Sequence, residues 1–241
     1  MKIFRQDCLT CYQKITHQND KLSYEKLEIC PECLLHLPWA KNNCYRCGLV
    51  TLALDDFRTC EQCRENPPYF DRLFAPFFYQ MPIAEMIMQL KFGRCVILAK
   101  TLHKLFLNRF AADFKAAQHN VPQMIIPMPL HKKRMRQRGY NQSYALARCF
   151  ADKSRLNPLF VPVHDRLAWR TKPTIAQSSL DKQDRQKNIK DAFAVSPQIA
   201  QYQHVAILDD VVTTGATANA LAKVIKVAGV DQVDLWCIAR A

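Results

Sequence analysis

The sequence predicts an α/β protein with a parallel sheet and a small N-terminal module that binds metal. Two observations lead to this prediction. Eight of the eleven cysteines form four Cys-x-x-Cys pairs within the first 63 residues, and beyond them apolar strand candidates alternate with helical segments. Strands that are connected through helices favour a parallel sheet with helices on both faces.

The bulk composition favours one ordinary domain plus a smaller one. The chain has 241 residues, of which 49% are hydrophobic, so it can form a real core and wholesale disorder is excluded. The N-terminus carries charges and lacks the apolar run of a secretory signal. The apolar stretch 73–90 is interrupted by Pro76, Pro82 and Glu85, so we expect no membrane insertion and a cytoplasmic protein.

The paired cysteines have the spacing of metal ligands. Thiols stay reduced in the cytoplasm, so eight of them in pairs predict two tetrahedral zinc sites. We favour sequential pairing, first pair with second and third with fourth, while a cross-braced arrangement stays open. Free thiols and a redox-active pair are weaker alternatives. The predicted ligands are Cys8, Cys11, Cys30, Cys33, Cys44, Cys47, Cys60 and Cys63, whereas Cys95, Cys149 and Cys237 are expected in the core.

The composition changes at Asn66-Pro67-Pro68, which divides the chain into a zinc module over 1–66 and an α/β domain over 67–241. The polar, basic segment 170–190 is expected to be a long loop or a weak helix. Hydrophobic periodicity predicts strands at 70–79, 124–126, 204–208 and 233–238, and helices at 83–90, 96–114, 141–152 and 217–228.

The most informative segment is VAILDDVVTTGAT at 205–217. Apolar residues form a buried strand, and Asp209 and Asp210 are predicted to stand at its carboxyl end, where open α/β sheets bind ligands. Carboxylates accept hydrogen bonds from vicinal hydroxyl groups, and threonines at a helix start hold a phosphate. An acidic pair that merely caps a helix is the weaker alternative, because it does not explain the Thr-Thr-Gly loop.

This segment resembles the phosphoribosyl diphosphate motif of type I phosphoribosyltransferases. The resemblance implies a parallel sheet of that kind, with Asp209 and Asp210 on the ribose hydroxyl groups. It also implies that the 5'-phosphate lies among Thr213, Thr214, Gly215, Ala216 and Thr217. Magnesium is expected with the ligand, because Mg²⁺ neutralises diphosphate oxygens.

Further motifs resemble the ComF family of competence proteins. They are Pro127-Met128-Pro129-Leu130, Arg138-Gly139-Tyr140-Asn141-Gln142, and the series Gln177, Arg185, Asn188 and Phe193. The resemblance covers nearly the whole chain. It implies a diphosphate-facing loop near Met128 and a flexible hood over 170–188. It also implies a role in natural transformation on incoming single-stranded DNA, with a helicase-like component of the uptake machinery as a partner.

The basic run that follows the strand candidate at 124–126 has two functional interpretations. Five permanent cations, Lys132, Lys133, Arg134, Arg136 and Arg138, fall within 131–138. They can clamp a diphosphate or track a nucleic-acid backbone, and a net charge of +13 suits either anion. A solvated surface loop is the third interpretation.

Three functions therefore compete: a competence factor that binds phosphoribosyl diphosphate and handles single-stranded DNA, an active phosphoribosyltransferase, and a sensor that binds phosphoribosyl diphosphate without turnover. The family resemblance ranks the first highest. Tyr140 and Trp169, near cationic residues, are candidate stacking surfaces for bases, although such aromatics are more often core residues.

Overall fold

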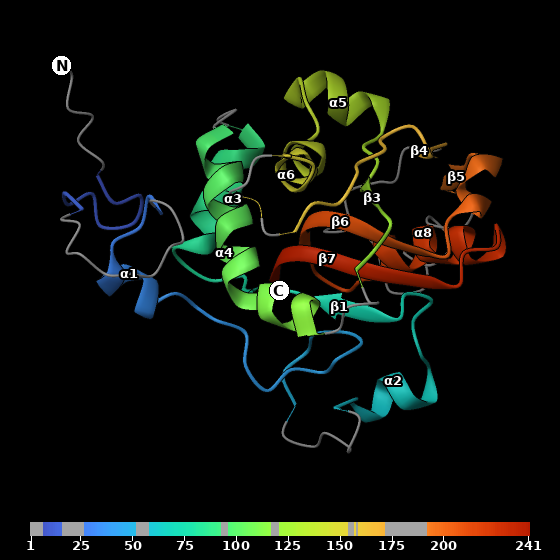
Figure 1. The fold of residues 1–241 in the computed structure, drawn as a ribbon, viewed down its shortest axis with the longest axis horizontal. Helices are drawn as coiled ribbons and strands as arrows, with labels where there is room; N and C mark the ends of the chain where they lie inside the picture. Colours follow the sequence, from blue (N-terminus) through green and yellow to red (C-terminus); the bar gives the residue numbers. More distant parts are fainter. Residues whose placement is uncertain are drawn as a thin grey trace.

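The computed structural model describes residues 7–15, 27–51, 58–92, 96–116, 121–153, 157, 159–171 and 192–241. Its centre is a parallel sheet in the order β1-β7-β6-β3, with β2 also paired to β7 (Figure 1). The predicted α/β fold with a parallel sheet is confirmed. The strands are β1 (Arg72–Phe74), β2 (Phe77–Phe78), β3 (Met124–Pro127), β6 (His204–Val212) and β7 (Gln232–Arg240).

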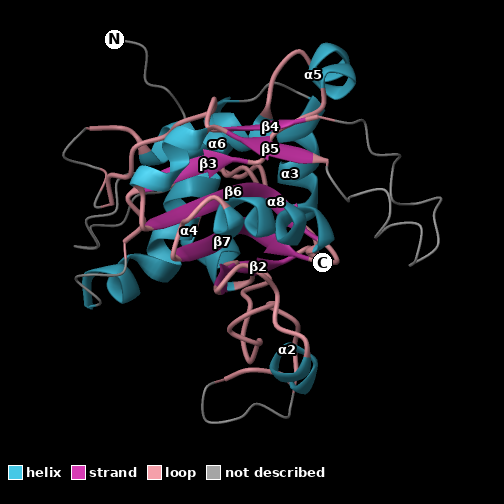
Figure 2. Cartoon of the chain, turned by 90° about the vertical axis from the view of Figure 1, so that its right-hand side faces the viewer, coloured by secondary structure: helices cyan, strands magenta, loops and turns pink. Residues whose placement is uncertain are grey.

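Helices cover both faces of this sheet (Figures 1 and 2). Side chains alternate along a strand, so Ala206 and Leu208 of β6 pack with the helices of one face and Val205 and Ile207 with those of the other. The first face holds α3 (Ile83–Phe92), α4 (Val96–Ala116) and α6 (Gln142–Phe150). The second holds α8 (Ala216–Val227), the antiparallel pair β4 (Ala168–Arg170) and β5 (Phe193–Val195), and the 3-10 helix Pro197–Gln201.

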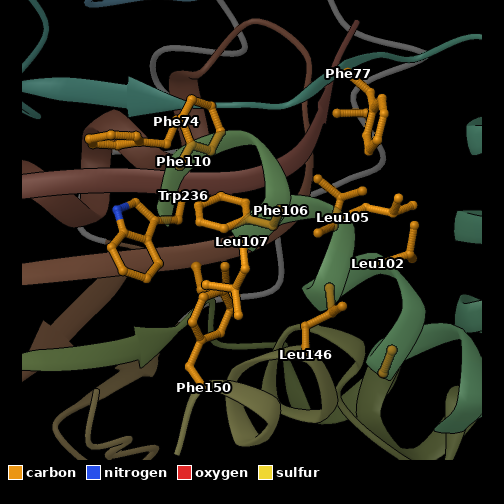
Figure 3. Close-up of a cluster of buried hydrophobic side chains, with 14 of the residues drawn as sticks. Phe74, Phe77, Leu102, Leu105, Phe106, Leu107, Phe110, Leu146, Phe150 and Trp236 are labelled. Atoms are coloured by element: carbon orange, nitrogen blue, oxygen red, sulfur yellow. The ribbon is translucent and has the colours of Figure 1, made fainter. Parts of the chain in front are cut away.

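An aromatic cluster around Trp236 fixes the first face (Figure 3). Trp236 is fully buried on β7, and its ring centroid lies 5.3 Å from that of Phe106 on α4 and 5.1 Å from that of Phe150 on α6. Large aromatic side chains dominate core energetics because each buries much apolar area. This cluster therefore holds both helices against the central strands.

Two predicted strands differ from the structure. The strand predicted at 70–79 is two short strands, β1 and β2, separated at Ala75-Pro76. Proline has no N–H to donate to a neighbouring strand, so the ladder is interrupted at Pro76. The Pro76 carbonyl accepts a hydrogen bond from the Ala40 N–H at 2.8 Å, outside the sheet. The strand predicted at 204–208 continues as β6 to Val212, so Asp209 and Asp210 lie within the strand rather than after it.

The other predicted elements agree with the structure to within about two residues at most ends. These are β3, β7, α3, α4, α6 and α8, of which α4 was predicted at 96–114 and extends over Val96–Ala116. No helix among the described residues is both long enough and apolar enough to cross a membrane.

The N-terminal segment also contains two short helices, α1 (Pro31–Leu35) and α2 (Glu61–Glu65), and it contacts the sheet directly. The Phe78 N–H donates to the Pro38 carbonyl at 2.9 Å, and the rings of Trp39 and Phe77 lie 4.5 Å apart. Near the chain end, the buried Arg240 guanidinium donates from Nε to the Cys47 carbonyl at 2.8 Å. Both halves of the cysteine-rich segment are thus joined to β2 or β7.

Gly48 is a point where this segment meets β1 closely. Its φ of +72° is left-handed, and a Cβ atom there would lie 2.7 Å from Cδ2 of Leu73. We expect Gly48→Ala to lower the free energy of unfolding by more than about 1 kcal/mol, because the strain of a left-handed backbone and the clash with Leu73 both destabilise the folded state. Denaturant unfolding of the zinc-loaded protein measures this loss.

Gly229→Ala is the matched control for that prediction. Gly229 also has a positive φ of +101°, but a Cβ atom there meets its nearest neighbour at 4.0 Å, an ordinary contact. The control should therefore lose stability through backbone strain alone. Equal losses for the two variants would contradict a close contact between Gly48 and β1.

Candidate functional site

The eight paired cysteines form two clusters. In each cluster all four Sγ atoms lie within 4.8 Å of one another, which confirms sequential pairing over the cross-braced alternative. The Cys11 and Cys30 sulfurs are 3.8 Å apart and the Cys47 and Cys60 sulfurs 3.7 Å apart. A tetrahedron with Zn–S bonds of about 2.3 Å has edges of about 3.8 Å, so the sulfurs fit zinc. The clusters are Cys8, Cys11, Cys30 and Cys33, and Cys44, Cys47, Cys60 and Cys63.

Backbone N–H groups support thiolates in the same way in both clusters. The Cys30 N–H donates to Cys8 Sγ, and the Cys60 N–H donates to Cys44 Sγ, each at 3.3 Å. Burial raises the pKa of both thiols, but the backbone hydrogen bonds outweigh it and lower the pKa to about 6 for Cys8 and about 7 for Cys44. Zinc binds the thiolate form, so these hydrogen bonds favour metal binding.

A second site is a pocket of about 230 Å³ at the carboxyl ends of β3 and β6. These strands pair in parallel with Pro127 opposite Leu208, and the Met128 N–H donates to the Leu208 carbonyl at 2.8 Å. The segment that follows β3 therefore lies beside the end of β6. Such a crevice is where open parallel sheets bind ligands.

The acidic pair lies in this pocket and is largely withdrawn from solvent. Asp209 Oδ1 accepts hydrogen bonds from Ser143 Oγ at 3.0 Å and from the Asp210 N–H at 2.9 Å. Asp210 is 4% exposed, and its Oδ2 lies 2.7 Å from Nζ of Lys91. Burial, and then the negative charge of Asp210, raise the pKa of Asp209 to about 8.

The threonine-rich turn follows β6 directly and opens α8. Gly215 is the N-cap of α8 with a φ of +75°, which glycine adopts without strain. The Ala216 N–H donates to Thr214 Oγ1 at 3.3 Å. All five residues that were predicted to surround a phosphate line the pocket: Thr213, Thr214, Gly215, Ala216 and Thr217.

The basic run forms a helix, α5 (Lys132–Arg138), and not a loop. His131 caps its start, because Nδ1 accepts from the Lys133 N–H at 3.2 Å, and Gly139 ends it with a φ of +76°. Arg134 and Arg138, one turn apart, line the pocket. The remaining cations, Lys132, Lys133 and Arg136, are exposed.

The Arg-Gly-Tyr-Asn-Gln segment shapes the pocket through its caps. Asn141 is the N-cap of α6, and its Oδ1 accepts from the N–H groups of Ser143 and Tyr144 at 2.9 and 3.3 Å. Its Nδ2 donates to the Met128 carbonyl at 3.0 Å, which ties α6 to the end of β3. This arrangement positions Ser143 against Asp209.

Sequence reasoning missed three polar residues that line the pocket: Lys91, Gln142 and Arg170. Gln142 belongs to the recognised motif, and its buried Oε1 has no hydrogen-bond partner among the described residues. Lys91 lies on α3, which carried no ligand-binding signal, whereas Arg170 ends β4 and begins the segment 170–188 that the family resemblance implied as a hood. Burial, and then the positive charge of Arg134, lower the pKa of Arg170.

Other predicted residues fall in different places. Gln177, Arg185, Asn188 and Cys95 lie outside the described residues, as does most of the segment predicted to be a loop or hood. Phe193 is buried in β5, Cys237 is fully buried and Cys149 is partly buried. Trp169 is 46% exposed on β4, and Tyr140 is partly buried.

The parallel sheet has a polar pocket at its strand ends, and two four-cysteine clusters precede it in the chain. These features place the chain among α/β proteins with an N-terminal double zinc ribbon. No family model matches the chain. It is 34% identical over 184 residues to Competence protein F of Haemophilus influenzae, covering 76% of this chain and 78% of that protein. The chain belongs to the ComF family.

The chain is also similar to a DNA utilization protein and to a second competence protein. The DNA utilization protein YhgH of Escherichia coli K12 is 32% identical over 216 residues, covering 88% of this chain and 90% of that protein. Competence protein ComFC of Bacillus subtilis is 29% identical over 121 residues, covering 48% of this chain and 45% of that protein.

The two clusters predict the metal content of the protein. Purified protein should contain two zinc ions per chain by elemental analysis, and Cys44→Ser should reduce this to one, because one cluster loses a ligand. Cys149→Ser, outside both clusters, should keep two. One zinc ion in the wild-type protein, or an unchanged content in Cys44→Ser, would contradict the assignment.

The raised pKa of Asp209 predicts how stability depends on pH. In the unfolded chain an aspartate titrates near about 4, so between about pH 4 and pH 8 the folded state binds more protons and stability falls as pH rises. Asp209→Asn removes this loss. Its free energy of unfolding, relative to wild type, should rise from pH 6 to pH 8 and level off above. A difference that does not change with pH would contradict the raised pKa.

Proposed function

We propose that the pocket binds phosphoribosyl diphosphate. The observation that supports this is that one pocket gathers an acidic pair, a threonine-rich helix start and several cations. A sugar with vicinal hydroxyl groups and phosphates at both ends needs these three kinds of group. In this proposal Asp209 and Asp210 hold the ribose hydroxyl groups, and the turn Thr213–Thr217 holds the 5'-phosphate.

The cations suit the diphosphate end of the ligand. Four cationic side chains and two carboxylates line the pocket, so a positive charge remains even when both acids are ionised. Arg134 and Arg138 of α5 line the pocket together with the segment after β3, and Arg170 adds a third guanidinium. Arginine binds phosphate through paired hydrogen bonds. Magnesium would accompany the diphosphate and bind its oxygens while keeping most of its own waters.

We further propose that the protein acts in natural transformation and handles single-stranded DNA. The names of its relatives, competence proteins and DNA utilization proteins, support the first part. For the second part, the solvent-facing side of α5 carries Lys132, Lys133 and Arg136, and the helix contains no acid. Exposed cations in a row attract a phosphate backbone and make binding salt-dependent.

The helical form of the basic run makes both parts testable with separate variants. Arg134→Ala with Arg138→Ala should weaken phosphoribosyl diphosphate binding by calorimetry at least about tenfold, since each lost charged hydrogen bond contributes about 1.5 kcal/mol or more. Lys132→Ala, Lys133→Ala and Arg136→Ala together should leave that affinity unchanged. They should weaken single-stranded DNA binding. The slope of the logarithm of the binding constant against the logarithm of the salt concentration should become less negative by about 0.7 for each phosphate contact that is lost.

Each variant is the control for the other. If the exposed triple variant weakens phosphoribosyl diphosphate binding as much as the pocket double variant does, the division of α5 into two faces is wrong. An unchanged salt slope in the triple variant would remove DNA from the function of α5. If Asp209→Ala with Asp210→Ala binds phosphoribosyl diphosphate as tightly as wild type, the pocket assignment fails. Diphosphate release from bound ligand would distinguish an enzyme from a binding protein.

A further inference from the structure

Lys91 is a charged residue in the pocket that the acidic motif does not explain. It lies in the last turn of α3, directly after Leu90, whose fully packed side chain anchors that turn in the core. Its Nζ lies 2.7 Å from Oδ2 of Asp210, and the side chains of the pair are only 21% and 5% exposed. Asp210 is therefore buried and Lys91 partly buried in this ion pair.

Two adjacent carboxylates without a counter-ion are a ready site for a divalent cation. Hard cations such as Mg²⁺ and Mn²⁺ prefer carboxylate oxygens, and a low local dielectric strengthens the attraction. In this protein Asp209 Oδ1 already accepts two hydrogen bonds, and Asp210 Oδ2 already contacts the Lys91 ammonium group. Lysine thus supplies at Asp210 the charge that a metal ion would otherwise bring.

We propose that Lys91 determines what the acidic pair can bind. Its ammonium group is the internal counter-ion of Asp210, so that the acidic pair excludes a free divalent cation and stays available to the uncharged hydroxyl groups of a sugar. This inference rests on the proposed function of the pocket and deepens it. It gives a role in that pocket to Lys91, a residue outside the segment 205–217. A divalent cation would then enter only with the phosphates of a ligand.

Lys91→Met tests the inference, because methionine keeps most of the length of the side chain and removes the charge. Mn²⁺ is titrated into the zinc-loaded protein without sugar phosphate, and free Mn²⁺ is followed by electron paramagnetic resonance. We expect Lys91→Met to bind one Mn²⁺ ion at the acidic pair at least about tenfold more tightly than the wild-type protein does, as measured by the dissociation constant. Adding Asp210→Asn should abolish the gain, and Lys91→Arg should bind as wild type does.

Lys226→Met is a matched control. Lys226 and Asp71 also lie 2.7 Å apart, but away from the pocket, so the loss of that pair should create no Mn²⁺ site that depends on Asp210. The inference is overturned if a folded Lys91→Met protein that retains two zinc ions gains no Mn²⁺ binding. It is also overturned if wild-type protein binds Mn²⁺ and Asp210→Asn abolishes that binding, a measurement that needs no Lys91 variant.

The test separates the inference from the proposed function. If Lys91→Met gains Mn²⁺ and wild-type protein does not bind phosphoribosyl diphosphate, the counter-ion assignment holds and the ligand assignment fails. If wild-type protein binds phosphoribosyl diphosphate and Lys91→Met gains no Mn²⁺, the ligand assignment holds and Lys91 is only a structural partner of Asp210.

Discussion

The parallel pairing of β3 with β6 is the constraint on which the pocket depends. Pro127 lies opposite Leu208, so the segment after β3 and the acidic pair, about 80 residues apart in the chain, end at the same edge of the sheet. The register is set by burial on both faces, because a slip of one residue would exchange Ala206 and Leu208 with Val205 and Ile207 between two different cores. The packing that specifies the fold therefore also specifies which polar groups meet.

Charge balance explains why this pocket can hold so many ionisable groups. Asp210 and Lys91 compensate each other, while burial, and then the positive charge of Arg134, lower the pKa of Arg170. Like charges that are held close together in a partly buried pocket raise its free energy, and an anion between them relieves the repulsion. The arrangement thus favours an anionic ligand.

The sequence predicted the sheet, the flanking helices and the metal ligands because each leaves a local signal: apolar periodicity for the first two and Cys-x-x-Cys spacing for the third. Prediction from the sequence failed where a structural feature depends on a contact between residues far apart in the chain. β6 extends through Asp209 and Asp210 because β7 continues beside it, with Asp209 opposite Cys237, although the apolar run stops at Leu208. Lys91 enters the pocket only because α3 packs on the core, which no local pattern encodes.

The basic run shows how local structure can separate two roles that composition leaves mixed. Five cations within 131–138 permit a ligand clamp or a nucleic-acid surface, and in an irregular loop the same side chains could serve either. The caps at His131 and Gly139 instead make a helix, and helical spacing sends Arg134 and Arg138 to the pocket and leaves Lys132, Lys133 and Arg136 in solvent. Arg138 also lies 5.5 Å from the ring of the exposed Phe92 on α3. A single short helix thus has two cationic faces, one that lines the pocket and one in solvent.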